Sequence, residues 1–500
     1  MAFLRIYLAK IFAALVVNRI RYWAKFPIKT QNKVFQKLIK TASKTKFGEN
    51  HKFVTIRNYK DFVENVPIRD YEGLKFYFDK VSAGQSDILW PGKPLYLAKT
   101  SGTTSGTKYI PITKQSIKAQ ISASRNAVLS YIHDTGKAKF VAGKWIFVQG
   151  SPVLTETNGI KTGRLSGISA HFVPSYLQRS RMPSWGVNCI EDWETKIEKI
   201  AEETINEDMT IIAGIPSWVQ MYFEKLINIK GTTVSEIFPR FNLLIFGGVN
   251  FEPYRVKFER LIGKKVDCIE LYPASEGFFA FQDLQDSRGM LLQLDSGIFY
   301  EFVSVDTFFK EDQHRIPLSE VKLGVNYVMV ISTNAGLWAY NIGDTVEFTS
   351  LNPYRIIVTG RIKHFISSFG EHVIAKEVES AITVALVNEN ARINEFTVAP
   401  FVNPAKGLPH HEWLIEFDSL PVNIDLFSKK IDNEMQNQNI YYKDLISGKI
   451  LKPLSISVVK KDGFMKYMRS IGKLGGQNKT PRLSNDRKIA NYLHNNNLVK

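Results

Sequence analysis

TSGTTSGTK, residues 100–108, follows directly on a strand-like run, PLYLA at residues 94–98. Glycines let a backbone approach phosphate oxygens closely, hydroxyl and N–H groups donate hydrogen bonds, and the terminal Lys108 supplies positive charge. The spacing is not that of a Walker loop, which needs G-x-x-x-x-G-K-[ST]. On composition alone, a solvated turn accounts for the stretch as well as a phosphate-binding loop does.

The segments around this stretch indicate an α/β domain. Residues 1–85 have the character of helices, and beyond residue 108 short apolar runs alternate with helical stretches. Short buried strands separated by helices are typical of an α/β architecture. The runs expected to form buried strands are residues 145–149, 210–213, 242–246 and 268–272.

The second half of the chain changes character twice. Residues 290–358 form β-rich, hairpin-like runs, which predict a β-rich subdomain. A mixed unit follows Gly360, with a strand near Phe365, a helix over 375–387 and later strands near Phe396 and at 413–417. We therefore expect a first domain over residues 1–360 and a second over 361–500, with the break between Thr359 and His364.

Two further strings have the chemistry of a nucleotide site. LYPASEG, residues 271–277, ends a predicted buried strand, where Tyr272 can cover an adenine face and Glu276 can hold Mg²⁺. LWAYNIGD, residues 337–344, places Asp344 just past a glycine, where its carboxylate can accept both ribose hydroxyls. Taken singly, a strand-end turn and an Asp in a β-turn are the simpler interpretations of these strings.

In their order along the chain, the strings resemble the signature motifs of one family. These are the motifs of the auxin-responsive (Gretchen Hagen) acyl-acid amido synthetases, a family of the adenylate-forming superfamily, and the likeness is to a bacterial-type member. The family's motifs run roughly Ser-Ser-Gly-Thr-Ser-Gly-Gly, Tyr-x-x-Ser-Glu and Tyr-x-x-Gly-Asp, and this chain supplies residues 100–108, 272–276 and 340–344. Residues 66–71 and 166–169 also resemble the family, so the likeness extends over nearly the whole chain.

The resemblance implies a fold and a reaction. The expected fold is α/β, with a large N-terminal adenylate-forming domain of β-sheets and helices that carries the β-rich subdomain, and a small, mobile α+β C-terminal domain. The expected reaction uses ATP and Mg²⁺ to activate a carboxylic acid as an acyl-AMP and passes the acyl group to an amine such as an amino acid. Glu276 is implied as a catalytic residue and as the Mg²⁺ ligand. The implied ATP-binding residues are Ser101, Gly102, Thr103, Thr104, Ser105, Lys108, Gly247, Tyr272, Ala274, Ser275, Asp344 and Arg361.

The C-terminal part resembles the superfamily at two places. Residues 360–363 match a G-R-x-[DK] hinge step, in which Arg361 would contact ribose or phosphate and Lys363 would be the pivot. The alternative is an ordinary strand, turn and amphipathic helix. Residues 477–482 match a string whose lysine, here Lys479, reaches the acid and the α-phosphate. Lys473, in a Gly-Lys step, is the second choice, and both lysines also fit a merely basic surface.

The acid-binding pocket is expected between the first and second motifs. Its candidates are not joined by any spacing rule, and core packing is an equally good reason for the aromatic side chains among them. The candidate residues are Ser169, His171, Phe172, Trp218 and Val219.

The N-terminal segment predicts a helix. Its longest uninterrupted apolar run, residues 11–17, is too short to span a bilayer. Leu4, Leu8, Ile11 and Leu15 follow helical spacing, so we expect this face to pack on the protein. A helix on a membrane surface, with weak membrane contact, and an export signal are the alternatives.

Composition bounds the remaining choices. The formal charge is 65 − 48 = +17, which can attract nucleic acid, anionic lipid or nucleotide phosphates. The motifs favour small phosphates, so no nucleic-acid partner is expected. Cys189 and Cys268 are isolated, which fits a reducing cytoplasm. The chain has no H-E-x-x-H zinc motif, so Mg²⁺ is the one metal expected.

Two other functions stay open at this point. An acyl-CoA ligase would use the same acyl-AMP with a thiol as acceptor. An inactive adenylating fold would instead act as a basic protein that binds nucleic acid or a membrane surface.

Overall fold

The structure is a computed structural model that describes residues 2–103, 106–248, 251, 255–308, 310, 313–362, 365–366, 368–371, 373–387, 389–471 and 480–500. The chain divides into two compact units. Unit 1 comprises residues 1–248 and 257–362, and unit 2 comprises residues 249–256 and 363–500.

The N-terminal region of unit 1 is helical, as its sequence predicts. Local signals explain where several of its helices begin: Pro27 occupies the first turn of α2, Asn58 forms a capping box with Asp61, and the Asp70 side chain accepts a hydrogen bond from the N–H of Gly73. The helices are α1 (Ala2–Lys25), α2 (Pro27–Ala42), α3 (Lys46–Asn50), α4 (Tyr59–Asn65) and α5 (Tyr71–Ser82).

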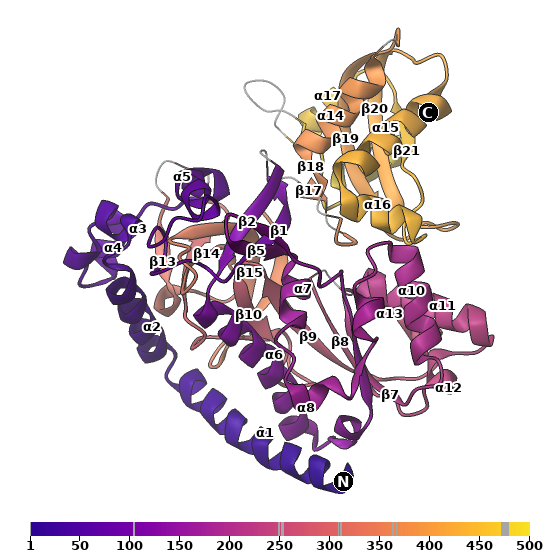
Figure 1. Ribbon diagram of the computed structural model, residues 1–500. Coiled ribbons are helices and arrows are strands. Elements are labelled where there is room, and N and C mark those ends of the chain that lie inside the picture. The colour runs from indigo at the N-terminus through magenta and orange to yellow at the C-terminus, as the bar shows by residue number, and fades with distance from the viewer. Residues whose placement is uncertain are drawn as a thin grey trace. The chain divides into compact units, whose positions relative to one another are not determined.

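The structural frame of unit 1 is a sheet of twelve strands (Figure 1). Its order is β13-β12-β14-β15-β16-β11-β10-β9-β8-β7-β3-β6. The strands from β6 to β9 are parallel and mostly apolar, as strands covered on both faces require. They are β3 (Lys144–Val148), β6 (Arg181–Met182), β7 (Met209–Gly214), β8 (Leu243–Gly247) and β9 (Asp267–Ala274), which confirms the four predicted buried strands.

The β-rich segment at residues 290–358, together with β10 before it, continues this same sheet in antiparallel pairing. Alternation of apolar and polar residues predicts strands but not which strand pairs with which. The sequence therefore could not predict that these strands belong to the larger sheet. The strands are β10 (Gly277–Phe281), β11 (Met290–Leu292), β12 (Ile298–Ser304), β13 (Arg315–Pro317), β14 (Asn326–Thr333), β15 (Tyr340–Leu351) and β16 (Tyr354–Arg361).

A second sheet of unit 1 carries the first motif. Its order is β2-β1-β5-β4, and β1 pairs with β2 in antiparallel fashion, from Tyr96 opposite Ile112 to Thr103 opposite Gly106. The strands are β1 (Tyr96–Thr103), β2 (Gly106–Ile112), β4 (Thr155–Thr157) and β5 (Ile160–Gly163).

The remaining helices of unit 1 connect and cover these strands. The longest, α6, begins at a capping box of Thr113 with Ser116 and ends at Gly136, whose φ of 69° is the left-handed conformation that favours glycine. It contacts α1 on one side and strands β9 and β10 on the other. The helices are α6 (Lys114–Thr135), α7 (Leu165–Ala170), α8 (Ser175–Gln178), α9 (Trp185–Asn188), α10 (Trp193–Thr204), α11 (Pro216–Lys230), α12 (Val234–Ile237) and α13 (Arg255–Ile262).

The structure reverses the predicted orientation of α1. The face expected to pack, formed by Leu4, Leu8, Ile11 and Leu15, is exposed. The buried face belongs to a neighbouring stripe that includes Ala13, Ile20 and Trp23, which join the main core. Both stripes have helical spacing and both are apolar, so periodicity alone could not tell which of them packs.

Unit 2 is an α+β unit, as predicted. Its three-stranded sheet, β19-β20-β21, pairs two antiparallel strands with one parallel strand, and β17 and β18 form a separate pair. The strands are β17 (Phe365–Ile366), β18 (Val373–Ile374), β19 (Arg392–Phe401), β20 (His410–Ser419) and β21 (Ser455–Val459). The helices are α14 (Ala375–Leu386), α15 (Ile424–Gln438), α16 (Ile440–Ser447), α17 (Gly463–Ser470) and α18 (Lys488–Asn495).

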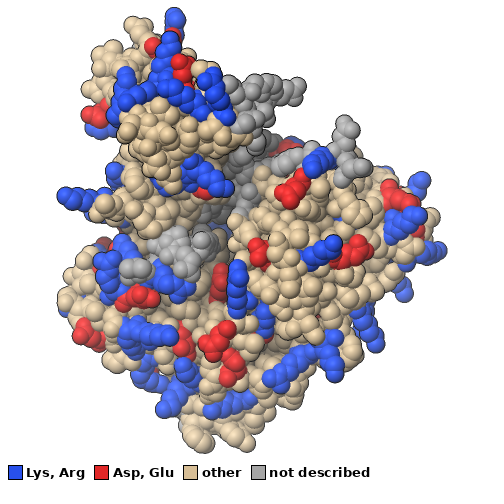
Figure 2. Space-filling model, turned by 180° about the vertical axis from the view of Figure 1, so that it is seen from behind, with Lys and Arg blue, Asp and Glu red and all other residues tan. Residues whose placement is uncertain are grey.

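The positive charge is spread rather than gathered on the face that Figure 2 shows. Lys and Arg side chains are distributed over this face, with Asp and Glu side chains among them. Such a surface attracts anions in general and does not by itself mark a nucleic-acid groove.

Candidate functional site

The second and third motifs meet through a direct hydrogen bond. Tyr272, near the end of β9, donates its hydroxyl to Asp344 Oδ2 on β15 at 2.6 Å. The tyrosine is 7% exposed, and its ring packs edge-on against Phe279 on β10 with centroids 5.0 Å apart. Residues 72 positions apart in the sequence therefore share one site.

A tight hairpin positions the second motif. Ala274 on β9 pairs with Gly277 on β10, which leaves Ser275 and Glu276 as the two-residue connection. A carboxylate in such a connection is held at the edge of the sheet, beside the strand that carries Tyr272.

Backbone geometry fixes the place of Asp344. Gly343, immediately before it, has a φ of 87°, a backbone conformation that residues with a Cβ rarely adopt. The Gly343 N–H donates to Asn341 Oδ1, and its carbonyl accepts from the N–H of Ile362, each at 2.8 Å. Asp344 in turn pairs with Arg361 on β16, so the predicted ribose contact and the predicted hinge arginine are neighbours across two strands.

Gly247 belongs to the same region. It ends β8 and pairs with Leu271, the residue before Tyr272. A Cβ at this position would collide with the carbonyl oxygen of Leu271, so the close approach of β8 to β9 requires glycine.

The first motif is linked to the third by a segment that the sequence left without a role. Arg69 forms a bridge with Tyr340: its N–H donates to the Ala339 carbonyl at 3.1 Å, and its carbonyl accepts from Asn341 at 2.8 Å. Two residues later, the Tyr71 hydroxyl accepts from the N–H of Tyr109 on β2 at 3.0 Å.

Tyr71 also lies against the predicted phosphate-binding lysine. Lys108 Nζ is 5.7 Å from the centre of the Tyr71 ring, within the range of a cation–π contact. In the sequence, residues 66–71 are marked only by their family resemblance, because neither Arg69 nor Tyr71 belongs to a chemical motif. The segment is thus a structural connection between the hairpin of the first motif and the strand of the third.

Several predicted residues lie where the structure does not describe them. Ser101, Gly102 and Thr103 end β1. Outside the described residues are Thr104, Ser105, Lys363, Lys473 and Lys479. Their predicted roles remain predictions.

The predicted acid-pocket residues lie on several elements of unit 1. Trp218 and Val219, on α11, are buried, and the Trp218 ring lies 4.6 Å from that of Trp193 on α10. Phe172 faces Tyr96, with ring centroids 5.9 Å apart. Ser169 lies on α7, which ends one residue before His171.

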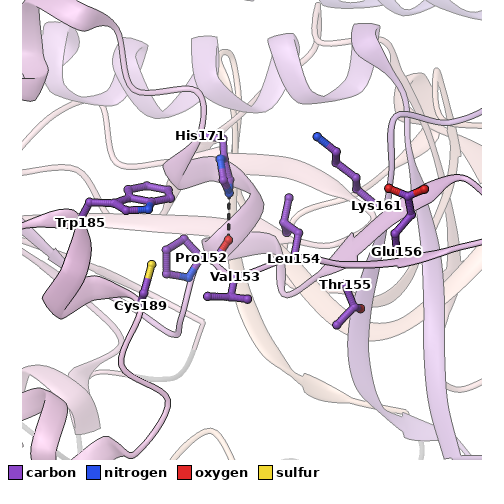
Figure 3. A pocket seen from close by; sticks show the side chains of 9 residues that line it. All are labelled: Pro152, Val153, Leu154, Thr155, Glu156, Lys161, His171, Trp185 and Cys189. Atoms are coloured by element: carbon purple, nitrogen blue, oxygen red, sulfur yellow. Dashed lines mark hydrogen bonds between the residues drawn. The ribbon is translucent and has the colours of Figure 1, made fainter.

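His171 is the member of that set that lines a surface pocket of about 270 Å³ (Figure 3). Its Nε2 lies 2.9 Å from the carbonyl oxygen of Pro152, and its ring meets the Trp185 ring edge-on at 5.0 Å. Figure 3 shows Trp185 on one side of the pocket and Lys161 and Glu156 on the other. The lining is Pro152, Val153, Leu154, Thr155, Glu156, Lys161, His171, Trp185 and Cys189.

A buried lysine supports one wall of this pocket. Lys196 Nζ on α10 donates to the carbonyl oxygen of Asn188, next to Cys189, at 2.6 Å. Burial lowers the pKa of Lys196 to about 8, because a charged amine is costly away from water. No sequence signal marks Lys196, since a lysine in an amphipathic helix normally faces solvent.

No carboxylate-rich metal centre is present in the part of the chain that the structure describes: it contains no group of three or more His, Cys, Asp or Glu side chains placed to hold a metal ion. One carboxylate near a triphosphate is nevertheless a sufficient protein contribution for Mg²⁺, which is commonly bound by one or two carboxylates, substrate phosphates and water. Glu276 fits that pattern.

Three family models match the chain. They describe the GH3 family N-terminal domain at residues 16–185, the central domain at 291–361 and the C-terminal domain at 376–488. Among curated relatives, the indole-3-acetic acid-amido synthetase GH3.10 of Arabidopsis thaliana is 28% identical over 213 residues, 40% of this chain and 34% of that protein. GH3.15 of the same plant is 23% identical over 84% of each chain. The chain spans about a third of the length of the first relatives it matches.

Solved structures show the same fold. The AtGH3.15 acyl acid amido synthetase in complex with 2,4-DB superposes with a TM-score of 0.62 at 17% identity, covering 98% of this chain and 96% of that one. The 2-hydroxyisobutyryl-CoA ligase in its thioesterification state gives 0.58 at 12% identity, covering 94% and 91%. With its motifs in order and its N-terminal, central and C-terminal regions all matched, the chain belongs to the GH3 family.

Proposed function

We propose that this protein activates a carboxylic acid with ATP and transfers the acyl group to an amine, most simply the amino group of an amino acid. The observation that carries the proposal is the hydrogen bond between Tyr272 and Asp344. It joins a residue suited to cover adenine with a residue suited to hold ribose, which supports a single nucleoside site built from two separate motifs.

The first half-reaction forms an acyl-AMP. A carboxylate oxygen of the acid attacks the α-phosphorus of ATP, and pyrophosphate leaves with the electron pair of the broken P–O bond. This chemistry mainly needs positioning and charge neutralisation. The β- and γ-phosphates would be held by Ser101, Thr103, Thr104, Ser105 and Lys108. Lys479 is the proposed contact of the carboxylate and the α-phosphate.

Glu276 is the proposed Mg²⁺ ligand. The metal would neutralise charge on the phosphate oxygens. The contribution of the chain itself is the two-residue connection between β9 and β10, which holds the Glu276 carboxylate next to the strand of Tyr272.

The second half-reaction forms the amide. The amine nitrogen attacks the acyl carbonyl, AMP leaves with the oxygen that joined it to the acyl group, and the nitrogen releases a proton. For this step we retain the domain boundary at residues 360 and 361 and the pivot at Lys363 as proposals. The boundary is supported by the compact division of the chain, in which unit 1 ends at Ile362.

The acid pocket completes the proposed site. We retain Ser169, His171, Phe172, Trp218 and Val219 as candidates, and the position of His171 in a pocket supports that residue in particular. The free thiols Cys189 and Cys268 support the cytoplasm as the compartment.

Product analysis tests the proposal. The full chain is incubated with ATP, Mg²⁺, a library of carboxylic acids and either an amino-acid mixture or coenzyme A, and the products are identified by mass spectrometry. We expect acid-dependent AMP and new amides in the amino-acid reaction. Thioesters in place of amides would make the protein an acyl-CoA ligase, and ATP left intact with every acid would point to an inactive fold.

A further inference from the structure

Helix α1 is apolar on two opposite faces. Its inner face packs against α6 and places Ala13, Ile20 and Trp23 in the core of unit 1. A helix that is apolar all round is normally buried all round. Here the second face is largely exposed, although the Arg125 guanidinium of α6 lies 5.5 Å from the centre of the Phe12 ring, and α1 runs along the outside of unit 1 (Figure 1).

The outer face is a continuous row of large apolar side chains. Single exposed apolar residues are ordinary, whereas a contiguous exposed row marks a surface that contacts something else. Their relative exposure lies between 43% for Ile11 and Phe12 and 82% for Phe3. The row comprises Phe3, Leu4, Tyr7, Leu8, Ile11, Phe12 and Leu15.

The charge on α1 itself is of one sign, and Arg19 forms an ion pair with Asp295 at 3.5 Å. The first acidic residue of the chain is Glu49. Before it stand eleven basic residues: Arg5, Lys10, Arg19, Arg21, Lys25, Lys29, Lys33, Lys37, Lys40, Lys44 and Lys46. On a helical projection, Arg5 and Arg19 fall on one side of the apolar row, and Lys10, Arg21 and Lys25 fall on the other.

We propose that the outer face of α1 binds the surface of an anionic lipid bilayer. In this arrangement the apolar row enters the boundary between headgroups and acyl chains, and the flanking arginines and lysines contact lipid phosphates. Their long aliphatic stems suit this position, because the charged ends can stay in water while the stems lie on apolar surface.

The pattern of charge selects this partner over two others. A second copy of α1 would bring together two helices that carry basic residues and no acidic ones, and these repel each other. A nucleic acid would meet the basic residues, but it would leave the aliphatic row of Leu4, Leu8, Ile11 and Leu15 without apolar contact. An anionic bilayer satisfies both features at once.

The helix would lie on the membrane and not cross it. Within the residues that the structure describes, none of the helices has the length and apolar character needed to span a bilayer. The inner face of α1 stays packed on α6, so binding needs no unfolding of unit 1.

Vesicle co-sedimentation of the full chain tests the proposal. Vesicles of phosphatidylcholine with phosphatidylglycerol are compared with vesicles of phosphatidylcholine alone, at low and at high salt. We expect binding to the anionic vesicles, weakened by salt, and at least about tenfold weaker binding to the neutral ones.

The variant Leu8→Gln/Ile11→Gln/Leu15→Gln removes the centre of the apolar row. Glutamine is a good helix former and the three side chains are exposed, so the fold is expected to stay intact, with an unchanged melting temperature. Vesicle binding is expected to fall by at least about tenfold. The matched control, Val54→Gln/Phe76→Gln/Ile229→Gln, changes three exposed apolar residues elsewhere in unit 1 and is expected to bind like the unchanged chain.

Three results would overturn the proposal. The first is equal binding by the α1 variant and the control. The second is equal binding of the unchanged chain to neutral and anionic vesicles. The third is a dimer of the unchanged chain that binds no vesicles and that the α1 variant converts to a monomer, which would assign the face to a second copy.

Discussion

At the scale of single residues, the hydroxyl of Tyr272 and the carboxylate of Asp344 carry most of the argument for a nucleoside site. Their types and motif positions could be predicted from the sequence, because each motif is local. Their hydrogen bond could not be, because it depends on the pairing order of strands between β9 and β15. Arg69 and Tyr71 were singled out only by family resemblance. Their role could not be predicted, because they join two motifs and neither resembles a catalytic group.

The first prediction concerns the variants Asp344→Asn and Tyr272→Phe. Loss of the charged acceptor is expected to raise the KM for ATP by about tenfold or more, and loss of the hydroxyl by several-fold. ATP titrations of acid-dependent pyrophosphate release measure both effects. Tyr300→Phe is the matched control, because it removes a buried hydroxyl that donates to the Gln293 carbonyl oxygen at 3.0 Å elsewhere in the same sheet. An unchanged KM for ATP in both site variants would remove them from the nucleotide site.

The second prediction concerns a buried ion pair of unit 1. Arg315 Nε lies 3.2 Å from Glu301 Oε1, and both side chains are almost completely buried. Arg315→Met would leave the carboxylate without its cation and is expected to lower the free energy of unfolding by about 3–5 kcal/mol. The double variant Glu301→Leu/Arg315→Met is expected to lose less, since no buried charge remains.

The pH dependence of the same variant has a definite sign. Burial raises the pKa of Glu301 above its ordinary value of 4.5, although Arg315 opposes this. A carboxyl with a raised folded pKa binds its proton more tightly in the folded state, so stability falls as pH rises above 4.5. Arg315→Met is therefore expected to be more destabilised at neutral pH than in mild acid. Urea unfolding at both pH values checks this, and equal losses for the single and double variants would contradict it.

At the scale of elements, the positions of the strands along the chain could be predicted, but the strand that each one pairs with could not. Apolar runs such as residues 242–246 predict a buried strand whichever sheet they join. Helix α1 shows that helical spacing predicts a helix but not which of its faces is buried. Leu4, Leu8, Ile11 and Leu15 have the spacing of a packing face, and only the position of α6 decides that the stripe with Ala13 and Trp23 packs instead.

The third prediction concerns the connection between β20, β21 and α18 in unit 2. Glu412 on β20 accepts hydrogen bonds from Ser457 on β21 at 2.6 Å, from Arg487 at 2.6 Å and, across a 2.7 Å contact, from His494 on α18. Burial alone would raise the pKa of Glu412, but these hydrogen bonds outweigh it and the pKa is lowered. A lowered carboxyl pKa contributes stability above the unfolded value of 4.5, and that stability is lost as pH falls through the folded pKa.

We therefore expect the amides of unit 2 to exchange hydrogen faster in acid. The variant Glu412→Gln is expected to lower the stability of unit 2 at neutral pH by about 1–3 kcal/mol and to make that stability less sensitive to acid. Hydrogen exchange of the β20 amides in the full chain, read by mass spectrometry at several pH values, measures this. Asp486→Asn, at an exposed carboxylate paired with Lys488, is the control. If hydrogen exchange in Glu412→Gln rose in acid as much as in the unchanged chain, Glu412 would not be the group that makes unit 2 sensitive to acid.

At the scale of the whole molecule, family membership was readable because three weak motifs occur in one order over a long chain. The comparisons confirm the predicted family and fold. The identity of the acid was not readable, because a pocket is built from side chains of many elements. Trp218 and Val219 illustrate this, since both are buried apolar residues of α11 and the Trp218 ring packs against that of Trp193 on α10. The catalytic lysine stays a prediction on residues outside the described ones.

The central claim is that a carboxylate oxygen of the acid attacks the α-phosphorus of ATP. The direct measurement uses a carboxylic acid that carries a heavy oxygen isotope in both carboxylate positions, with mass analysis of every product of the full reaction. The account predicts one labelled oxygen in AMP, the other in the amide and none in pyrophosphate. Unlabelled AMP, or label in inorganic phosphate together with ADP, would contradict it.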